Sequence, residues 1–403
     1  MYLNEIEKQV GLLKTLKCDK LKGLSLSDLW GMRCFLSDEK FTRLNGKTVV
    51  NSFLPPFPGK SFDKLVEGIK SLKNGKAVPV SSYISITNKC RLKCWHCSKE
   101  FRGSGDMCLE TALKLIKDLQ NMGVCIIGFT GGEPLMRDDL EEMIEAVDER
   151  SETILFTSGD GFDTKRAREF KKRGLFGVAV SLDHYDAKIH DERRGKEGAF
   201  ASALDAIRIS RRLNFYTMIQ LVATRDIVNK KTFEKYLKLA GDLGVHEIRL
   251  LEPMPTGRLL KGDGSCCLAE DERKQLRLLH QFTNRVKDLP KVCSFAQIEH
   301  GEMYGCGAGF QHMYIDAEGN VCPCDFVPVS FGNINKESLE DIWRRMNGAF
   351  HKPRRRCFLL DNADKLKKAF SGKLPIPFES IQNDCQFCHK GEVPDYYKVL
   401  GWS

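Results

Sequence analysis

The sequence predicts an α/β fold, a partial (β/α)6 TIM-like barrel, and two observations lead to it. From about residue 82 to residue 251, six short runs rich in β-branched and aromatic residues alternate with amphipathic stretches of helical period. Such alternation is typical of repeated β-α units whose strands form one parallel sheet. Because six units are fewer than the eight of a complete TIM barrel, the expected barrel is incomplete.

The elements of this barrel can be placed by their patterns. The expected strands are 83–87, 124–129, 153–157, 176–182, 217–222 and 247–251. The expected helices are 111–122, 139–149, 163–173, 199–213 and 231–243, followed by a helix at 269–288 that closes the barrel. In sheets of this kind the ligand lies beyond the carboxyl ends of the strands, so the functional site is expected there.

The chain divides into three parts by composition. Residues 1–80 are predicted to form a helical N-terminal region, with helices at 4–17, 24–36 and 61–73 and a loop rich in Pro and Phe at 53–59. Residues 81–288 are predicted to form the barrel. Residues 289–403 combine short elements with several cysteines and are predicted to form a small C-terminal iron-sulfur domain.

Length and composition narrow the class of protein. The 403 residues can bury a large core, and neither an apolar stretch long enough to span a membrane nor a signal peptide is apparent, so a cytoplasmic protein is expected. Sixteen cysteines in a reducing compartment favour metal binding over disulfides. The net charge is +9, and residues 1–80 carry 14 Lys and Arg against 8 Asp and Glu. No motif indicates a nucleic-acid partner.

Three cysteines directly follow the first expected strand. Cys90, Cys94 and Cys97 have the spacing C-x3-C-x2-C. Three thiolates on one short loop can each bind one iron of a [4Fe-4S] cluster and leave the fourth iron free for another ligand. The alternative is a zinc site or a set of buried cysteines, but structural zinc needs a fourth protein ligand.

This loop resembles the cluster motif of the radical S-adenosylmethionine (SAM) enzymes. In that family SAM chelates the free iron, and its reductive cleavage yields a 5'-deoxyadenosyl radical. The segment Gly131-Gly132-Glu133-Pro134 after the second expected strand resembles the family's GGEP motif, whose tight turn binds the amino group of SAM. Glycines permit close backbone approach and proline fixes the exit of the turn.

The resemblance implies further SAM contacts, although this sequence departs from the family pattern at some of them. Ser158 stands where asparagine is frequent, and Ser181 and Asp183 lie in a segment that contributes polar contacts in relatives. Arg194 could hold the SAM carboxylate, and Gln220 could face the ribose. An arginine that only caps local structure and a satisfied polar residue inside the barrel are the respective alternatives.

A second cysteine pattern lies near the C-terminus. Cys306, Gly319 and Cys324 have the spacing C-x12-G-x4-C, which resembles the opening of the module called SPASM, and residues 313–321 are typical of a β-hairpin. The shorter twitch module of relatives holds one auxiliary [4Fe-4S] cluster. In this chain Cys385 and Cys388 would complete a set of four thiolates.

Several alternatives remain open at this second site. Cys322 and Cys357 are spare cysteines and could replace one of the four ligands, and a zinc ion on the same four cysteines is also conceivable on ligand type. Asp325, next to Cys324, matches an aspartate thought to take a proton from the substrate in sulfatase-maturing relatives. Burial that raises its pKa would suit such a base. Arg258, after the sixth strand, is expected to face the substrate.

The resemblance implies a radical SAM enzyme that abstracts hydrogen from an unactivated carbon, with an auxiliary cluster that accepts or relays an electron. It also implies SAM, two [4Fe-4S] clusters and a reductant such as a flavodoxin or ferredoxin. A peptide or small-metabolite substrate is favoured. The alternatives are a membrane lipid, reached through the basic N-terminal region and an exposed apolar loop at Phe53, Leu54 and Phe57, and a non-enzymatic iron-sulfur electron carrier.

Overall fold

One parallel sheet organises the protein. The computed structural model describes residues 25–388 and 391–403, so the helix expected at 4–17 lies outside the described residues. The nine-stranded sheet has the order β11-β10-β3-β4-β5-β6-β7-β8-β9. Its six central strands are Ser81–Thr87 (β3), Ile126–Gly131 (β4), Glu152–Thr157 (β5), Gly177–Ser181 (β6), Tyr216–Val222 (β7) and Glu247–Leu251 (β8). These are the six predicted strands, paired in parallel and in sequence order, which confirms the α/β barrel.

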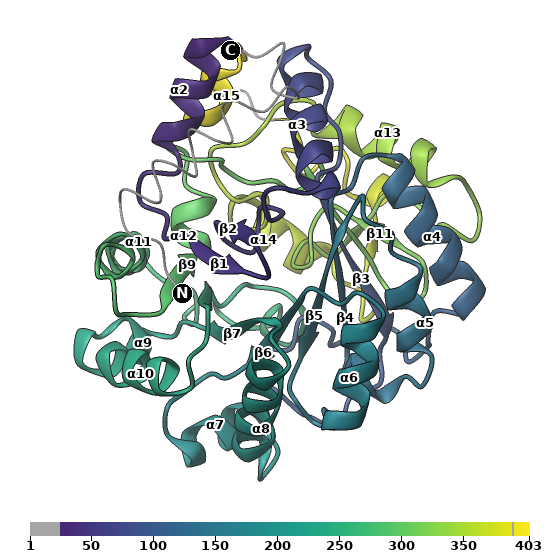
Figure 1. Cartoon of the computed structure of the whole chain (residues 1–403). Helices are drawn as coiled ribbons and strands as arrows, with labels where there is room; N and C mark the ends of the chain where they lie inside the picture. The colour runs from purple at the N-terminus through teal and green to yellow at the C-terminus, as the bar shows by residue number, and fades with distance from the viewer. Residues whose placement is uncertain (1–24, 389–390) are drawn as a thin grey trace.

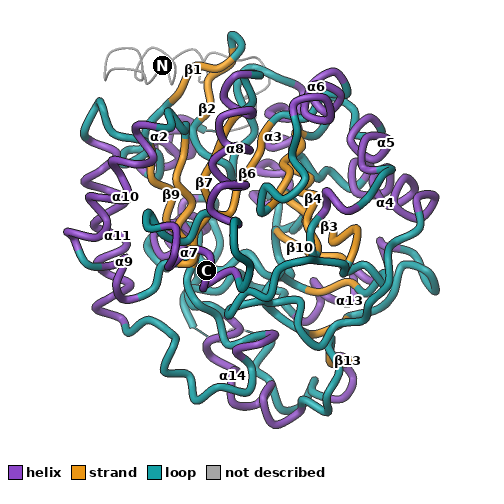
Figure 2. The backbone as a smooth tube through the Cα atoms, turned by 90° about the horizontal axis from the view of Figure 1, so that it is seen from below, coloured by secondary structure: helices purple, strands orange, loops and turns teal. Residues whose placement is uncertain are grey.

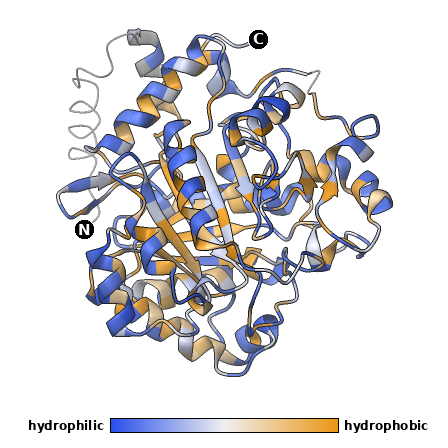
Figure 3. Ribbon diagram, turned by 90° about the vertical axis from the view of Figure 1, so that its right-hand side faces the viewer, coloured by the Kyte–Doolittle hydropathy of each residue, from blue (hydrophilic) through white to orange (hydrophobic). Residues whose placement is uncertain are grey.

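Helices cover the outside of this sheet (Figures 1 and 2). Each connection returns the chain so that the next strand runs parallel to the previous one. The helices are Leu109–Asn121 (α4), Leu140–Glu145 (α5), Thr164–Lys172 (α6), Ala187–Arg194 (α7), Ala199–Arg212 (α8), Arg225–Val228 (α9), Lys230–Asp242 (α10) and Glu270–Arg285 (α11). Figure 3 shows why they pack there, because the helices carry apolar residues on one side and polar residues on the other.

The sheet extends past the six predicted strands at both edges. Lys291–Ser294 (β9) pairs in parallel with β8, and His312–Ile315 (β10) pairs in parallel with β3. Val321–Cys322 (β11) then returns antiparallel to β10, which confirms the expected hairpin. The C-terminal region therefore continues the barrel sheet, and the boundaries placed at residues 80 and 288 stay predictions.

The rest of the C-terminal region consists of short elements around an aromatic cluster. These elements are Phe295–Ile298 (α12), Val329–Ser330 (β12), Leu339–Ala349 (α13), Phe358–Ala369 (α14), Ile376–Pro377 (β13) and Asp395–Val399 (α15). The ring of Phe387 contacts those of Phe331, Phe350, Phe358 and Phe378, with ring centroids 4.9 to 5.7 Å apart. This cluster fixes the segment that contains the last two cysteines.

The N-terminal region lies against the end of the chain. It contains Leu26–Cys34 (α2), a hairpin of Thr42–Leu44 (β1) and Lys47–Val49 (β2), and Lys60–Lys73 (α3). Helix α15 lies beside α2 (Figure 1), and the indole of Trp402 donates a hydrogen bond to the carbonyl of Leu72 in α3 at 2.9 Å. The helices expected at 24–36 and 61–73 are present, whereas the hairpin was not predicted because its strands are only three residues long.

The loop after β2 enters the amino end of the barrel. The backbone N–H of Ser52 donates to the carboxylate of Glu247 on β8 at 3.0 Å, and the Ser52 hydroxyl contacts both Glu247 and Arg249. The ring of Phe53 packs on that of Phe295 at 4.9 Å, and the ring of Phe57 packs on that of Phe62 at 5.0 Å.

The expectation of an exposed apolar tip at Phe53, Leu54 and Phe57 is therefore wrong. All three side chains are half-buried. Their apolar surface is used to close the barrel, since burying it there removes it from water. Within the described residues, no helix is long and apolar enough to cross a membrane.

Candidate active site

The three cysteines of the first motif lie on a loop beyond the carboxyl end of β3. Cys90 is exposed, and Cys94 and Cys97 are half-buried. Although Cys90 is exposed at the loop surface, the surrounding protein atoms exclude part of the water around its thiol, and this desolvation raises the pKa of Cys90 to about 11. The backbone N–H of Lys93 donates to the carbonyl of Arg194 at 3.0 Å, so the end of α7 holds the loop in place.

The donor set of this loop fits a cluster better than a single ion. Among the residues that the structure describes, no three His, Cys, Asp or Glu side chains converge as one metal ion requires. A [4Fe-4S] cluster gives each thiolate its own iron, so its sulfurs stand apart. Both polar atoms of the Asn88 side chain are buried without a partner at the start of the loop. Buried polar groups in that state are suited to a bound ligand.

The GGEP turn packs against the same loop. The backbone N–H of Gly132 donates to the carbonyl of Thr87 at 2.7 Å, and that of Glu133 donates to the carbonyl of Lys89 at 2.8 Å. A Cβ atom on Gly132 would lie 2.1 Å from the Lys89 oxygen, and Gly131 has a φ of 150°. Glycine is required at both positions because the turn and the cysteine loop touch through their backbones.

The side chain of Glu133 is used inside the protein. Its buried carboxylate accepts hydrogen bonds from the hydroxyl of Thr157 at 2.6 Å, and from the backbone N–H and hydroxyl of Ser158 at 2.7 and 2.5 Å. Burial raises the pKa of Glu133, although these hydrogen bonds act in the opposite direction. Glu133 and Ser158 thus connect the ends of β4 and β5. Pro134 begins a 3-10 turn of three residues, Pro134–Met136.

The remaining predicted SAM contacts lie at the ends of β6 and β7. Ser181 and Gln220 are neighbours in the sheet register, and both are half-buried. Arg194 forms a buried ion pair with Asp183 at 2.7 Å and approaches the Cys94 sulfur to 3.8 Å. The structure therefore brings Arg194 to a carboxylate and a thiol of the protein.

Arg258 also serves the cysteine loop. Its guanidinium donates to the carbonyls of Lys93 and Cys94 at 2.9 and 2.8 Å and pairs with Glu100 at 2.6 Å. The expectation that Arg258 faces the substrate is wrong, because these contacts direct its donors at the loop backbone.

One residue of the motif was missed by the sequence analysis. His96 lies beside Cys97, its Nδ1 is buried without a partner, and burial lowers its pKa to about 4. It lines a small hollow together with Val222, Thr256 and Phe326. Its position between the last two cysteines of the motif was the only signal in the sequence.

A larger cavity of about 170 Å³ extends from the barrel mouth into the C-terminal region. Its lining includes the loop 51–54, the start of β3, the end of β8, helix α12 and the segments 306–308, 324–327 and 357–360. The lining is mainly apolar, with a few acidic and basic side chains among it. Enclosed apolar pockets with few polar groups are typical of ligand sites.

Asp325 faces this cavity within a chain of polar groups. Its carboxylate lies 3.0 Å from Nε2 of His312, and Nδ1 of His312 lies 2.8 Å from the hydroxyl of Ser81. Burial acts to raise the pKa of Asp325, but the hydrogen bond and charge of His312 and the charge of Lys99 outweigh it and lower the pKa. The expectation of a raised pKa is therefore wrong in direction.

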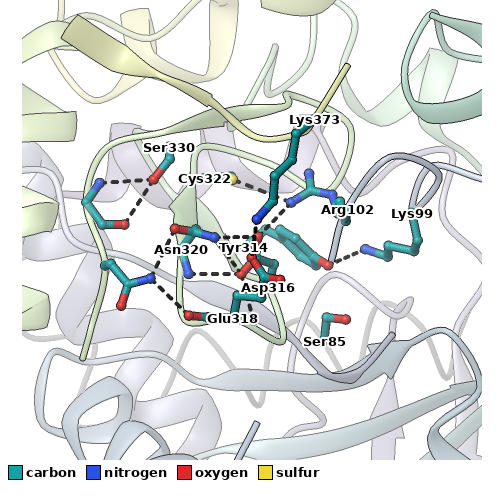
Figure 4. A network of polar contacts seen from close by, with 12 residues as sticks. Ser85, Lys99, Arg102, Tyr314, Asp316, Glu318, Asn320, Cys322, Ser330 and Lys373 are labelled. Atoms are coloured by element: carbon teal, nitrogen blue, oxygen red, sulfur yellow. Dashed lines mark hydrogen bonds and ion pairs between the residues drawn. The ribbon is translucent and has the colours of Figure 1, made fainter. Parts of the chain in front are cut away.

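A second polar network joins the cysteine loop to the β10–β11 hairpin (Figure 4). The ammonium of Lys99 donates to the hydroxyl of Tyr314, and burial lowers the pKa of Lys99 to about 8. Arg102 forms a buried ion pair with Asp316 at 3.1 Å and lies 3.9 Å from the sulfur of Cys322. Cys322 is thus held by Arg102 and is not among the residues that line the cavity.

The remaining cysteines separate into two groups. Cys306, Cys324 and Cys357 line the cavity, and a hydrogen bond from the Cys357 thiol lowers the pKa of Cys306. Cys385 is buried outside the cavity lining, and the sulfur of Cys388 lies 3.1 Å from Nε2 of His351. The structure brings Cys357 to the site and places Cys388 beside a histidine.

Two family models match this chain. The radical SAM superfamily matches residues 84–241, which contain the cysteine loop and the GGEP turn, and an iron-sulfur cluster-binding domain called SPASM matches residues 306–368. The chain contains a radical SAM domain and a SPASM domain. It is therefore an enzyme whose cofactors are SAM, a SAM-binding [4Fe-4S] cluster and an auxiliary cluster, and the electron-carrier hypothesis is set aside.

Curated relatives of this radical SAM enzyme include two proteins named AdoMet-dependent heme synthase. That of Oleidesulfovibrio alaskensis is 27% identical over 285 residues, which are 64% of this chain and 73% of the relative. That of Methanosarcina barkeri is 27% identical over 286 residues, which are 64% of this chain and 80% of the relative.

Two solved structures share the fold of this radical SAM enzyme. Streptococcus suis SuiB bound to S-adenosylmethionine superposes with a TM-score of 0.57 at 15% identity over 71% of this chain and 72% of SuiB. Native anSMEcpe with bound AdoMet superposes with a TM-score of 0.55 at 18% identity over 80% of this chain and 95% of that chain.

Proposed function

We propose that this enzyme oxidises an organic substrate held in the cavity between the barrel and the auxiliary site. When bound, SAM and the first cluster supply a 5'-deoxyadenosyl radical that removes hydrogen from an unactivated carbon, and the auxiliary cluster accepts or relays an electron. The observation that carries this proposal is the cavity itself, because Cys306, Cys324, Cys357 and Asp325 all line it. A substrate there would lie against both an electron acceptor and a proton acceptor.

The chain's own residues would hold the cofactors on the barrel side. Cys90, Cys94 and Cys97 would bind the cluster, and Arg194 and Arg258 keep their loop in shape through the contacts described above. The backbone of the Gly131-Gly132 turn lies against that loop and would bind SAM there. Ser181 and Gln220, at the ends of neighbouring strands, offer it polar side chains.

The proton that the substrate loses would be accepted by Asp325, which contacts His312 and, through it, Ser81. Asp325 is an ionised acceptor at neutral pH because His312 favours its charged form. The other nitrogen of His312 contacts the Ser81 hydroxyl, so Asp325, His312 and Ser81 form one chain of polar groups. This arrangement supports oxidation of the substrate by loss of a hydrogen atom, a proton and an electron.

The shape of the cavity favours a peptide side chain or a small metabolite as the substrate. A volume of about 170 Å³ suits a group of that size, and the apolar lining suits an uncharged part of it. SuiB, which shares the fold, has been crystallised with its precursor peptide SuiA. A lipid is less favoured, because the rings expected to reach a membrane are packed against the barrel.

A second candidate is a reaction in haem formation. It is favoured by the name of the curated relatives, which match up to 69% of this chain. Incubation with a haem precursor and SAM under anaerobic conditions would show it directly by the appearance of the haem absorbance.

A flavodoxin or ferredoxin is proposed as the electron donor. Cys90 is exposed at the surface of the cysteine loop, and Lys89, Arg91 and Lys93 beside it are exposed as well. A basic surface of this kind attracts an acidic partner by long-range electrostatics.

The class of reaction is tested by iron content and SAM cleavage. Anaerobically reconstituted protein should hold about eight irons in two [4Fe-4S] clusters. The combined Cys90→Ala, Cys94→Ala and Cys97→Ala variant should hold about four and make no 5'-deoxyadenosine. Cys34→Ala, at an exposed cysteine far from both motifs, is the control and should behave as the wild type. Undiminished 5'-deoxyadenosine from the triple variant would contradict the proposal.

A further inference from the structure

We propose that Cys357 is a ligand of the auxiliary cluster, with Cys306, Cys324 and Cys385 as the other three, and that Cys388 is not a ligand. The inference rests on the auxiliary cluster of the proposed function and assigns its protein ligands. It differs from the set suggested by sequence spacing, in which Cys385 and Cys388 act together as a C-x2-C pair.

The first argument is that Cys357 shares a site with Cys306 and Cys324. All three cysteines line the same cavity. Their thiols come from three separate segments of the C-terminal region. Thiols brought together by the fold at one cavity are the donor set that an iron-sulfur cluster requires.

The second argument is how the backbone fixes this group. The backbone N–H of Cys306 donates to the carbonyl of Arg354 at 2.8 Å, which holds the segment before Cys357 against Cys306. Cys357 immediately precedes Phe358, the first residue of α14, and Arg354 forms an isolated β-bridge with Cys306. The backbone therefore fixes the start of α14, and with it Cys357, against the Cys306 segment.

The third argument concerns the choice between Cys385 and Cys388. Cys385 is buried, with 6% of its surface exposed. The residue after it, Gln386, donates its backbone N–H to the side chain of Asn362 in α14 at 3.1 Å, and its carbonyl accepts from Arg354 at 2.9 Å. The same arginine therefore ties the Cys385 turn to the Cys306 segment.

Cys388 and Cys322 have different surroundings. The sulfur of Cys388 is half-exposed and lies 3.1 Å from Nε2 of His351, which does not line the cavity. Cys322 lies within reach of Arg102, in the network that joins the hairpin to the cysteine loop (Figure 4). The sulfurs of Cys388 and Cys322 thus lie beside a histidine and an arginine, whereas Arg354 ties the turn that contains Cys385 to the Cys306 segment.

Alkylation of the wild-type holoenzyme tests the assignment without any variant. Iodoacetamide is added anaerobically before and after removal of iron by a chelator, and the labelled cysteines are located by mass spectrometry. We expect Cys388 to be labelled in both states and Cys357 only after iron is removed. Labelling of Cys357 in the holoenzyme, with protection of Cys388 that ends on chelation, would overturn the inference.

Matched single variants provide an independent measurement. Cys357→Ser should lower the iron content from about eight to about four and remove the auxiliary signal from the electron paramagnetic resonance spectrum, whereas Cys388→Ser should leave both unchanged. The opposite pattern would overturn the inference while the proposed function stands. A wild-type protein that holds only about four irons would instead remove the auxiliary cluster from the proposed function, and this assignment with it.

Discussion

Replacing Phe53 by alanine should destabilise the whole enzyme, because this ring helps to close the amino end of the barrel. The ring is half-buried, its centroid lies 4.9 Å from that of Phe295, and the guanidinium of Arg249 lies 5.0 Å from it. Because the ring is half-buried, truncation to alanine loses about half of the roughly 1.5–3 kcal/mol that full burial of a phenylalanine side chain contributes. To this are added about 0.5–1.5 kcal/mol for the aromatic pair and about 0.5–2 kcal/mol for the cation–π contact.

The expected loss of unfolding free energy is therefore about 2–5 kcal/mol, which overlaps the range for large-to-small changes at buried phenylalanines. Urea unfolding followed by far-UV circular dichroism measures it as a lower midpoint with an unchanged slope. Phe282→Ala is the matched control, because that ring is 59% exposed and should change stability by less than about 1 kcal/mol. If Phe53→Ala matched the wild type in stability but bound anionic liposomes less well, the inward packing of this loop would be refuted and the membrane hypothesis restored.

Three further outcomes follow from the structure. Gly132→Ala should destabilise the protein by about 1–3 kcal/mol and reduce its iron content, because the added Cβ would meet backbone atoms. Gly105→Ala is the control and should have no effect, because open space surrounds Gly105. Equal iron contents in the two variants would contradict the prediction. Asp316→Asn should lower the unfolding free energy by about 3–5 kcal/mol, since it leaves Arg102 buried without a carboxylate, and a loss below 1 kcal/mol in urea would argue against the ion pair. Burial lowers the pKa of His246 to about 3, so the free energy of unfolding should be highest above pH 6.5 and should fall by about 2 kcal/mol on acidification to pH 5. In unfolding experiments from pH 7 to pH 5, the His246→Gln variant should lose this pH dependence.

The barrel was predictable because its strands carry local signals. Each of the six strands is a run of apolar and β-branched residues beside an amphipathic helix, and both patterns are visible in a short window. Strand β9, with four residues, and the β1–β2 hairpin are too short to leave such a pattern. The pairing of β10 with β3 joins residues more than 200 positions apart, so no local pattern could indicate it.

The site was predictable only where its residues form short motifs with a characteristic spacing. The C-x3-C-x2-C loop and the GGEP turn were found because each is a contiguous motif whose residues act together. The roles of Arg194 and Arg258 depend on groups that only the folded chain brings near, a carboxylate for one and loop carbonyls for the other. The direction of the pKa of Asp325 was missed for the same reason, since His312 reaches it through the pairing of β10 with the barrel.

The shared sheet also sets the spacing between the two cysteine sites. Cys90 follows the carboxyl end of β3, whereas β11 brings Cys324 back toward the level of His312, which pairs with Ser81 at the start of β3. The six steps between the seven residues from Ser81 to Thr87, at about 3.3 Å each, place the two levels roughly 20 Å apart along the strand. The length of strand β3 therefore sets the separation of the two cysteine sites. Insertions in the outer loops leave this separation unchanged, whereas a change in the register of β10 on β3 would move the two cysteine sites relative to each other.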